Sequence, residues 1–215
     1  MAYLDSATGH LKLQIVYDGA PFSGKTSSVV ALGCLLGSPV DSPGEEQGRT
    51  NFFDWMDYSG GLCHGNPVQC RVLTVPGQVD RTTRRELLLS AADAVLFVVD
   101  TSAGSFAVSQ KWFESLGVLL GHRRYAPPVV LQLNKRDEAD ALPTRDVIDM
   151  IDPTLPYVET VATKGDGIRE AFVLSVSLSI RGLRTSGRLY PSGVFDTQEL
   201  QLPDREQLLE LLQQV

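Results

Sequence analysis

The chain has 215 residues, 43% of them hydrophobic and 21% charged, which fits one globular domain with a tail. Its formal net charge of −7 argues against nucleic acid or an anionic membrane as the main ligand. The three cysteines are too few and too scattered for a disulfide framework, so we expect a reducing, cytoplasmic location. We expect no signal peptide and no integral membrane segment, because no apolar run is long enough.

Apolar strand-like segments alternate with helical segments along the chain, a pattern typical of a parallel α/β sheet. We expect six strands, at residues 11–17, 52–58, 68–73, 94–100, 129–133 and 156–161. The expected helices cover residues 26–36, 80–91, 106–121, 144–151 and 167–183. A surface loop at 37–50 and a hairpin connection at 60–67 are indicated by their glycine and proline content.

The last part of the chain differs from the rest in composition. Residues 1–183 form the expected domain, and residues 184–215 are interpreted as a linker and a C-terminal amphipathic helix capped by Asp204. This helix could dock on its own domain or on a partner, and a frayed terminal helix is an equally good interpretation.

The pattern G-x-x-x-x-G-K-[ST], which binds phosphate, lies between the first expected strand and the first expected helix. It is matched by Gly19, Ala20, Pro21, Phe22, Ser23, Gly24, Lys25 and Thr26. The glycines let successive N–H groups point at phosphate oxygens. Lys25 can reach the β- and γ-phosphates, and the Thr26 hydroxyl can bind Mg²⁺.

A second pattern, N-K-x-D, follows the expected strand at 129–133. It consists of Asn134, Lys135 and Asp137 around Arg136. The Asp137 carboxylate can accept two N–H groups of guanine, whereas adenine would leave it unpaired. Asn134 braces the loop, and the Lys135 stem can lie over the base. The pattern predicts guanine nucleotide and argues against the alternative of an ATP-dependent P-loop kinase or ATPase.

With these motifs the chain resembles the Ras-like small GTPases, and among them the bacterial MglA family of gliding-motility and polarity GTPases, over about residues 10–183. Residues 74–78 are similar to switch II, which usually reads D-x-x-G-Q. The resemblance implies that Gly77 donates to the γ-phosphate and that Gln78 orients the attacking water. Thr74 replaces the usual Asp, as in the MglA group, which weakens the expected hold on Mg²⁺.

The resemblance also assigns switch I and the last nucleotide loop. Residues 48–54 are similar to switch I, which implies that Thr50 binds Mg²⁺ and senses the γ-phosphate. It implies too that Arg49 acts as an arginine finger in cis, although Arg49 could instead be a solvated loop residue. The Ala162 N–H would meet the guanine O6. Arg81, Arg84 and Arg85 are interpreted as a solvated face of the switch II helix, although the resemblance also implies that this helix commonly meets partners.

The resemblance therefore implies a P-loop NTPase of the Ras-like G-domain type: an α/β fold with a six-stranded mixed, mostly parallel sheet flanked by helices. It implies a switch that binds GTP and GDP with Mg²⁺ and hydrolyses GTP slowly without an activating partner. The implied partners are a roadblock-fold homodimer of the MglB type and effectors at the switch regions, with recruitment to a cell pole left open. The alternative is a GTP-binding scaffold that does not hydrolyse GTP.

Overall fold

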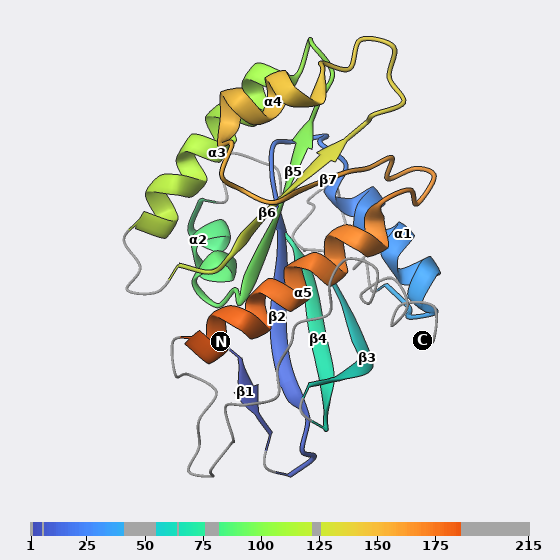
Figure 1. Ribbon diagram of the computed structural model, residues 1–215, viewed down its shortest axis with the longest axis vertical. Coiled ribbons are helices and arrows are strands. Elements are labelled where there is room, and N and C mark those ends of the chain that lie inside the picture. The colour runs from blue at the N-terminus through green and yellow to red at the C-terminus, as the bar shows by residue number, and fades with distance from the viewer. Residues whose placement is uncertain are drawn as a thin grey trace, which may run out of the picture.

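The computed structural model describes residues 2–5, 7–40, 55–63, 65–75, 82–121 and 126–185, without the side chains of 55, 62 and 82–84. Its centre is one sheet in the strand order β3-β4-β2-β5-β6-β7, with β1 paired to β2 (Figure 1). The strands are β1 Tyr3–Leu4, β2 Leu11–Asp18, β3 Trp55–Cys63, β4 Asn66–Thr74, β5 Ala94–Asp100, β6 Val129–Asn134 and β7 Tyr157–Glu159.

The sheet is mixed and mostly parallel, as expected. Two pairs are antiparallel, β1 with β2 and β3 with β4, and the other neighbours are parallel. The expected number of six strands is wrong, because the sheet has seven. The additional strand is β1, whose two residues pair with Leu11 and Lys12 at the start of β2. A two-residue strand is too short to show an alternating pattern in the sequence.

Each expected helix is present, with ends shifted by at most two residues. The helices are α1 Lys25–Leu36, α2 Thr82–Ser90, α3 Phe106–Gly121, α4 Thr144–Ile151 and α5 Ile168–Thr185. Helix α5 continues two residues past the expected domain end at 183, and the rest of the tail lies outside the described residues.

The hairpin of β3 and β4 is longer than expected. The predicted connection at 60–67 is wrong, because β3 continues to Cys63 and β4 begins at Asn66. The strand register shifts between Ser59 and Leu62, so that Gly60 and Gly61 lie in a bulge of the strand rather than in the turn. Glycine in a strand interrupts the alternation of apolar and polar side chains from which a strand is predicted, and it often marks such a bulge.

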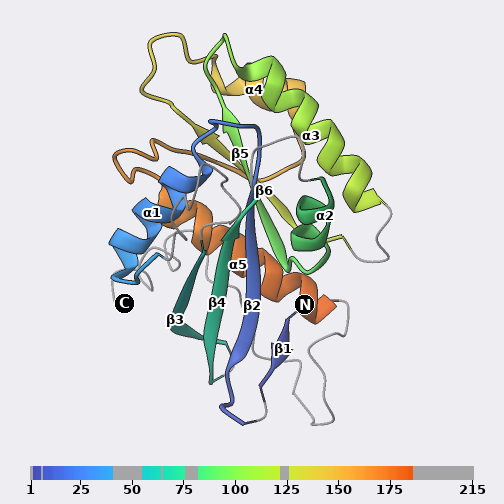
Figure 2. The same ribbon diagram turned by 180° about the vertical axis from the view of Figure 1, so that it is seen from behind.

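Two layers of helices cover the sheet (Figures 1 and 2). Helices α1 and α5 pack on one face, where β2 contributes Leu13, Ile15 and Tyr17. Helices α2, α3 and α4 pack on the other face, where β2 contributes Val16. Every residue of β5 is buried, because this central strand faces a helical layer on both sides. Burial of each valine, leucine or phenylalanine side chain of β5 stabilises the fold by about 1.5–3 kcal/mol.

The parallel strands determine where a site can form. The loops after β2, β5 and β6 lie at the same edge of the sheet, in the upper part of Figure 1. Ligands of open α/β sheets bind at this carboxyl edge. The residues of both predicted nucleotide motifs come from these loops.

Candidate nucleotide-binding site

The predicted phosphate loop connects β2 to α1 in a conformation that requires its two glycines. Gly19 has φ 143° and Gly24 has φ 103°, both values that L side chains rarely adopt. A Cβ atom at Gly19 would collide with the Val98 carbonyl oxygen of β5, and one at Gly24 with the Asn134 side chain. The loop therefore lies directly on the ends of the central strands. Between the glycines Ala20 and Ser23 are buried, whereas the Phe22 side chain is 93% exposed.

The Lys25 ammonium is held inside this loop. Its Nζ donates to the main-chain oxygens of Gly19 at 2.8 Å and Ala20 at 2.7 Å, and the residue is 7% exposed. Burial is the main reason that the pKa of Lys25 falls to about 8; the charge of Asp18 opposes this fall and that of Arg85 adds to it. A bound phosphate would replace the hydration that this cation has lost. Thr26 follows, exposed, in the first turn of α1.

Asn134, at the end of β6, joins three predicted segments. Its Nδ2 donates to the Ser23 carbonyl in the phosphate loop at 2.8 Å. Its Oδ1 accepts from the Ala162 N–H at 3.0 Å and from the Thr160 hydroxyl at 3.2 Å. The structure thus brings the phosphate loop, the N-K-x-D loop and the Ala162 loop together. The Ala162 N–H is engaged by Asn134 here, so a guanine O6 would share or take over this donor.

Lys135 is fixed by an aspartate that the sequence reasoning missed. Its backbone is left-handed, with φ 65°, and its Nζ donates to Asp100 Oδ2 at 2.6 Å. Burial acts to raise the pKa of Asp100, but hydrogen bonds from Lys135 and Ser102 outweigh it and hold that pKa below its ordinary value. The position of Asp100, as a carboxylate ending a buried apolar strand, was the available signal.

The Asp137 carboxylate stays within reach of a ligand. Its side chain is 34% exposed, and its Oδ2 lies 3.1 Å from the Nζ of Lys164 in the Ala162 loop. The hydrogen bond from Lys164 holds the pKa of Asp137 below its ordinary value. An ionised carboxylate here can accept two parallel N–H groups, as a guanine offers.

Comparison with known proteins agrees with this geometry. Over 195 aligned residues the chain is 27% identical to the mutual gliding-motility protein MglA of Myxococcus xanthus, covering 87% of this chain and 100% of MglA. The chain is therefore similar to MglA along most of its length. The solved structure of the Arl6 BBS3 small GTPase from Trypanosoma brucei, with the bound nucleotide analogue GppNp, has a TM-score of 0.60 and 22% identity. That match covers 80% of this chain and 99% of the Arl6 chain, and it confirms the expected fold. No family model matches the chain.

Four residues that the MglA resemblance assigns lie outside the described part of the structure: Arg49, Thr50, Gly77 and Gln78. Thr74, which replaces the switch II Asp, is the last residue of β4 and is 4% exposed. Thr74 is paired in register with Tyr17, near the end of β2. It therefore lies at the same edge of the sheet as the phosphate loop.

The fit to Mg²⁺ depends on the phosphates of a nucleotide. Among the residues with described positions, no group of three or more His, Cys, Asp or Glu side chains could hold a metal ion. The Thr26 hydroxyl supplies one oxygen of the kind that Mg²⁺ prefers, and Mg²⁺ in nucleotide sites takes its other ligands largely from phosphates and water. The residues of the candidate site therefore fit this ion in company with a nucleotide.

One expectation about helix α2 is wrong. Arg85 is not part of a solvated face: it is 7% exposed and lies 2.7 Å from Asp18, which is fully buried. Arg81 and the side chain of Arg84 lie outside the described residues. Charged residues are seldom buried without a partner, and the sequence offers no sign that these two side chains meet.

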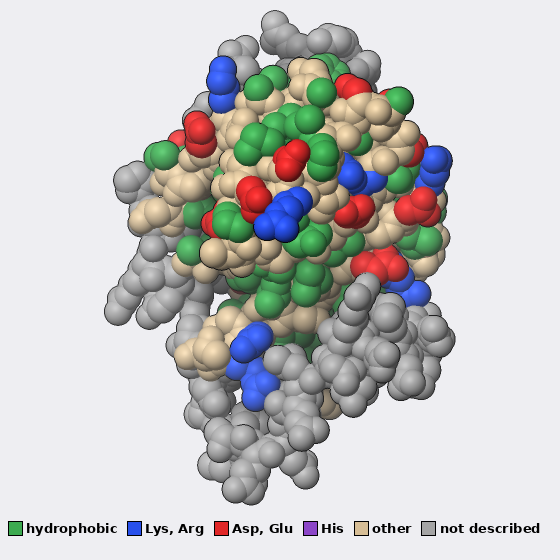
Figure 3. Space-filling view, turned by 45° about the horizontal axis from the view of Figure 1, so that its top comes forward, with side chains coloured by type: hydrophobic (Ala, Val, Ile, Leu, Met, Phe, Trp, Pro, Cys, Tyr) green, Lys and Arg blue, Asp and Glu red, His purple; other side chains and the backbone are tan. Residues whose placement is uncertain are grey.

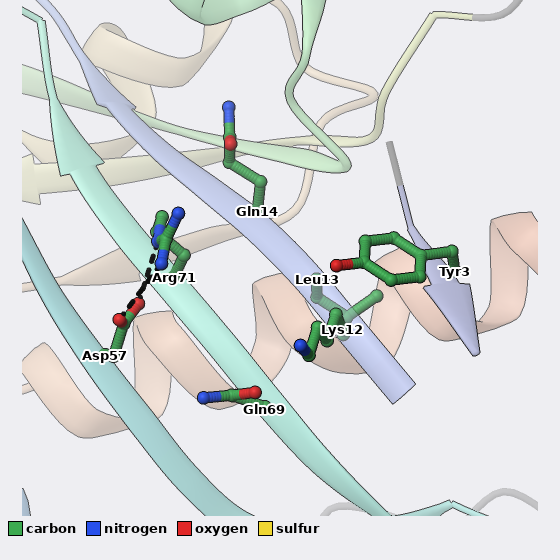
Figure 4. Close-up of a pocket in the computed structure, with 7 residues that line it drawn as sticks. All are labelled: Tyr3, Lys12, Leu13, Gln14, Asp57, Gln69 and Arg71. Atoms are coloured by element: carbon green, nitrogen blue, oxygen red, sulfur yellow. Dashed lines mark hydrogen bonds and ion pairs between the residues drawn. The ribbon is translucent and has the colours of Figure 1, made fainter. Parts of the chain in front are cut away.

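A polar hollow of about 200 Å³ lies away from this site, on β2, β3 and β4 near the start of β2 (Figure 4). Its two cations already have partners: Arg71 binds Asp57 at 2.9 Å and Lys12 binds Asp5 at 2.8 Å. Acidic and basic side chains are also interspersed over the described residues of the face in Figure 3, where they form no continuous basic patch. The loops at the carboxyl edge remain the best candidate site.

Proposed function

We propose that this chain is a molecular switch that binds GTP and GDP with Mg²⁺ and hydrolyses GTP to GDP and phosphate. The observation that carries the proposal is the set of hydrogen bonds made by Asn134. They hold a phosphate-binding loop and a guanine-reading loop at one strand edge, at a separation set by the sheet. A site organised in this way fits a purine nucleotide with its phosphates in the glycine-rich loop.

The proposed binding roles are supported by the described positions of these residues. Lys25 and the backbone N–H groups of residues 19–26, except Pro21, take the phosphates. Thr26 holds Mg²⁺, and Asp137 accepts the guanine N–H groups. The stem of Lys135, tethered to Asp100, supports the base. The Ala162 N–H contributes to reading the guanine O6.

The hydrolytic roles rest on the resemblance to MglA alone. Thr50 and Gly77 sense the γ-phosphate, and Thr50 adds a second protein ligand for Mg²⁺. Gln78 positions the attacking water and Arg49 stabilises the charge that develops in the transition state. The rival proposal is a scaffold that binds GTP without hydrolysing it and that the Thr74 replacement locks in one state. Phosphate release with and without an activating partner separates the two.

The experiment that tests nucleotide choice starts with release and chromatography of whatever nucleotide co-purifies, followed by titration with labelled GDP, GTP and ATP. We expect guanine nucleotide, a Mg²⁺-dependent response, and no response to ATP. Asp137→Asn should weaken GTP binding and favour xanthosine nucleotide, because the amide offers a donor where guanine needs an acceptor. Asp149→Asn, at an exposed carboxylate on α4, is the matched control. Equal binding of ATP and GTP by the parent chain would refute the proposal.

The relative's name points to a process. We propose that the chain regulates motility or cell polarity and that a roadblock-fold homodimer of the MglB type activates it, with effectors contacting the switch regions. None of the described helices is long and apolar enough to cross a membrane. Purified roadblock dimer from the same organism should accelerate phosphate release; a failure to bind it would remove this part of the proposal.

A further inference from the structure

The buried pair of Asp18 and Arg85 has no part in the proposed function, yet it joins two elements of the site. Asp18 is the last residue of β2 and directly precedes Gly19 of the phosphate loop. Arg85 belongs to α2, the helix that follows the switch II segment. Its Nη2 donates to Asp18 Oδ2 at 2.7 Å, and its Nε lies 3.1 and 3.2 Å from the two carboxylate oxygens.

The remaining donors of Arg85 reach α3. Its Nη2 also donates to the Trp112 carbonyl at 3.1 Å, and its Nη1 donates to the Ser115 hydroxyl. The guanidinium lies over the Trp112 ring, 4.6 Å from the ring centroid. One side chain therefore connects α2 to the end of β2 and to α3. The planar fork of arginine suits such a junction, whereas a lysine could not make the paired contacts.

Helix α2 also packs through apolar side chains. Of its side chains with described positions, Arg85, Leu88 and Leu89 are buried, and they share one face because they are three and four residues apart. Leu87 on another face is 69% exposed. Among the described side chains of α2, Arg85 is the buried one nearest the start of the helix, and it lies seven residues after Gln78 in the sequence.

A buried ion pair is a poor means of adding stability, since apolar residues of similar size often serve as well or better. The pair instead fixes the position of α2, because a shift of this helix would separate the charges and leave the Asp18 carboxylate buried without its partner. We propose that the Asp18–Arg85 pair is a latch that positions α2 against the base of the phosphate loop, and so couples phosphate occupancy to the placement of switch II. The coupling to phosphate rests on the proposed function.

The test replaces both charges. Arg85→Met alone should lower the melting temperature, because it leaves a buried carboxylate unpaired. The double variant Asp18→Leu/Arg85→Met should recover thermal stability, yet release fluorescent GDP about tenfold faster, a coupling of the size usual between linked sites. Amide hydrogen exchange in α2 should also be faster than in the parent chain. The control is Asp57→Leu/Arg71→Met, which removes an exposed pair on the same sheet and should leave GDP release and α2 exchange unchanged.

The variant Arg85→Lys keeps the charge and removes the fork, so it tests the latch even if the double variant fails to fold. It should show faster GDP release and faster α2 exchange at a melting temperature close to that of the parent chain. Parent-like release and exchange in Arg85→Lys and in the double variant would overturn the latch, as would equal acceleration in the control pair. If the parent chain binds no guanine nucleotide, the proposed function fails, and α2 exchange in the nucleotide-free protein still decides whether the pair positions the helix.

Discussion

The side-chain amide of Asn134 donates to the carbonyl oxygen of Ser23 at 2.8 Å, across a sequence separation of 111 residues. The same side chain accepts from the Ala162 N–H at 3.0 Å. Asn134 is 2% exposed, so solvent could not easily take over its hydrogen bonds if the side chain were removed. One buried amide therefore links the predicted phosphate and base loops, which the sheet already places at the same edge.

Replacement of that amide should be costly. Asn134→Ala leaves the Ser23 carbonyl and the Ala162 N–H buried without this partner, and we expect a loss of about 3 kcal/mol in the free energy of unfolding. Affinity for GDP should fall at least about tenfold, because the two loops lose their common support. Urea unfolding and GDP titration measure both. Gln110→Ala, which removes an exposed amide bonded to the Met150 carbonyl, should change stability by less than about 0.5 kcal/mol. A similar loss in both variants would contradict the bracing role.

A glycine series separates steric clash from backbone strain. Gly24→Ala introduces a Cβ that collides with Asn134 at φ 103°, and we expect a loss of more than about 3 kcal/mol together with loss of GDP binding. Gly37 has φ 63°, and a Cβ atom there would meet no other atom within 4 Å. Gly37→Ala should therefore cost only the backbone strain of a left-handed residue, about 1–2 kcal/mol. At Gly104 an added Cβ atom meets no neighbour and the backbone is not left-handed, so Gly104→Ala should be nearly neutral. Thermal unfolding ranks the three, and a mild Gly24→Ala variant would show that the loop can move off Asn134.

The Asp100 carboxylate should make stability depend on acid pH. Because its folded-state pKa lies below the ordinary value of 3.8, its contribution is present above that value and is lost as the pH falls through the lower, folded-state pKa. The difference in unfolding free energy between the parent chain and Asp100→Asn should therefore be largest near about pH 7 and shrink below about pH 4. Urea unfolding of the nucleotide-free protein at several pH values measures it. Asp149→Asn, in an exposed pair 3.7 Å from Arg145, should have little effect at any pH.

The three thiols should react in a fixed order. Cys34 is exposed, Cys63 is partly covered and Cys70 is buried. Burial raises the pKa of Cys63 above its ordinary value, and burial together with the charge of Asp93 raises the pKa of Cys70 to about 12. At about pH 8 a disulfide reagent should modify Cys34 quickly, Cys63 slowly and Cys70 only after unfolding. Cys34→Ser should remove the fast phase, and a fast phase that persists in this variant would place another thiol at the surface.

Elements with a strong local pattern could be predicted from the sequence. The apolar run 94–100 became the fully buried strand β5, and each expected helix is within two residues of its observed ends. Errors fell where the local pattern is weak. Strand β1 is only two residues long, and Gly60 and Gly61 hid the continuation of β3, since glycine contributes no side chain to an alternating pattern.

By itself, the sequence determined the two nucleotide motifs and their placement after strands, because loop chemistry and hydrophobic runs are properties of neighbouring residues. Only the tertiary structure decided which polar side chains meet. Arg85 had the local appearance of a solvated arginine, and its burial against Asp18 arises from the packing of α2 on β2 and α3. The partners of Asn134, Lys135 and Asp137 were decided in the same way. Burial and pairing of charged groups depend on contacts between residues far apart in the chain, and no pattern among adjacent residues encodes them.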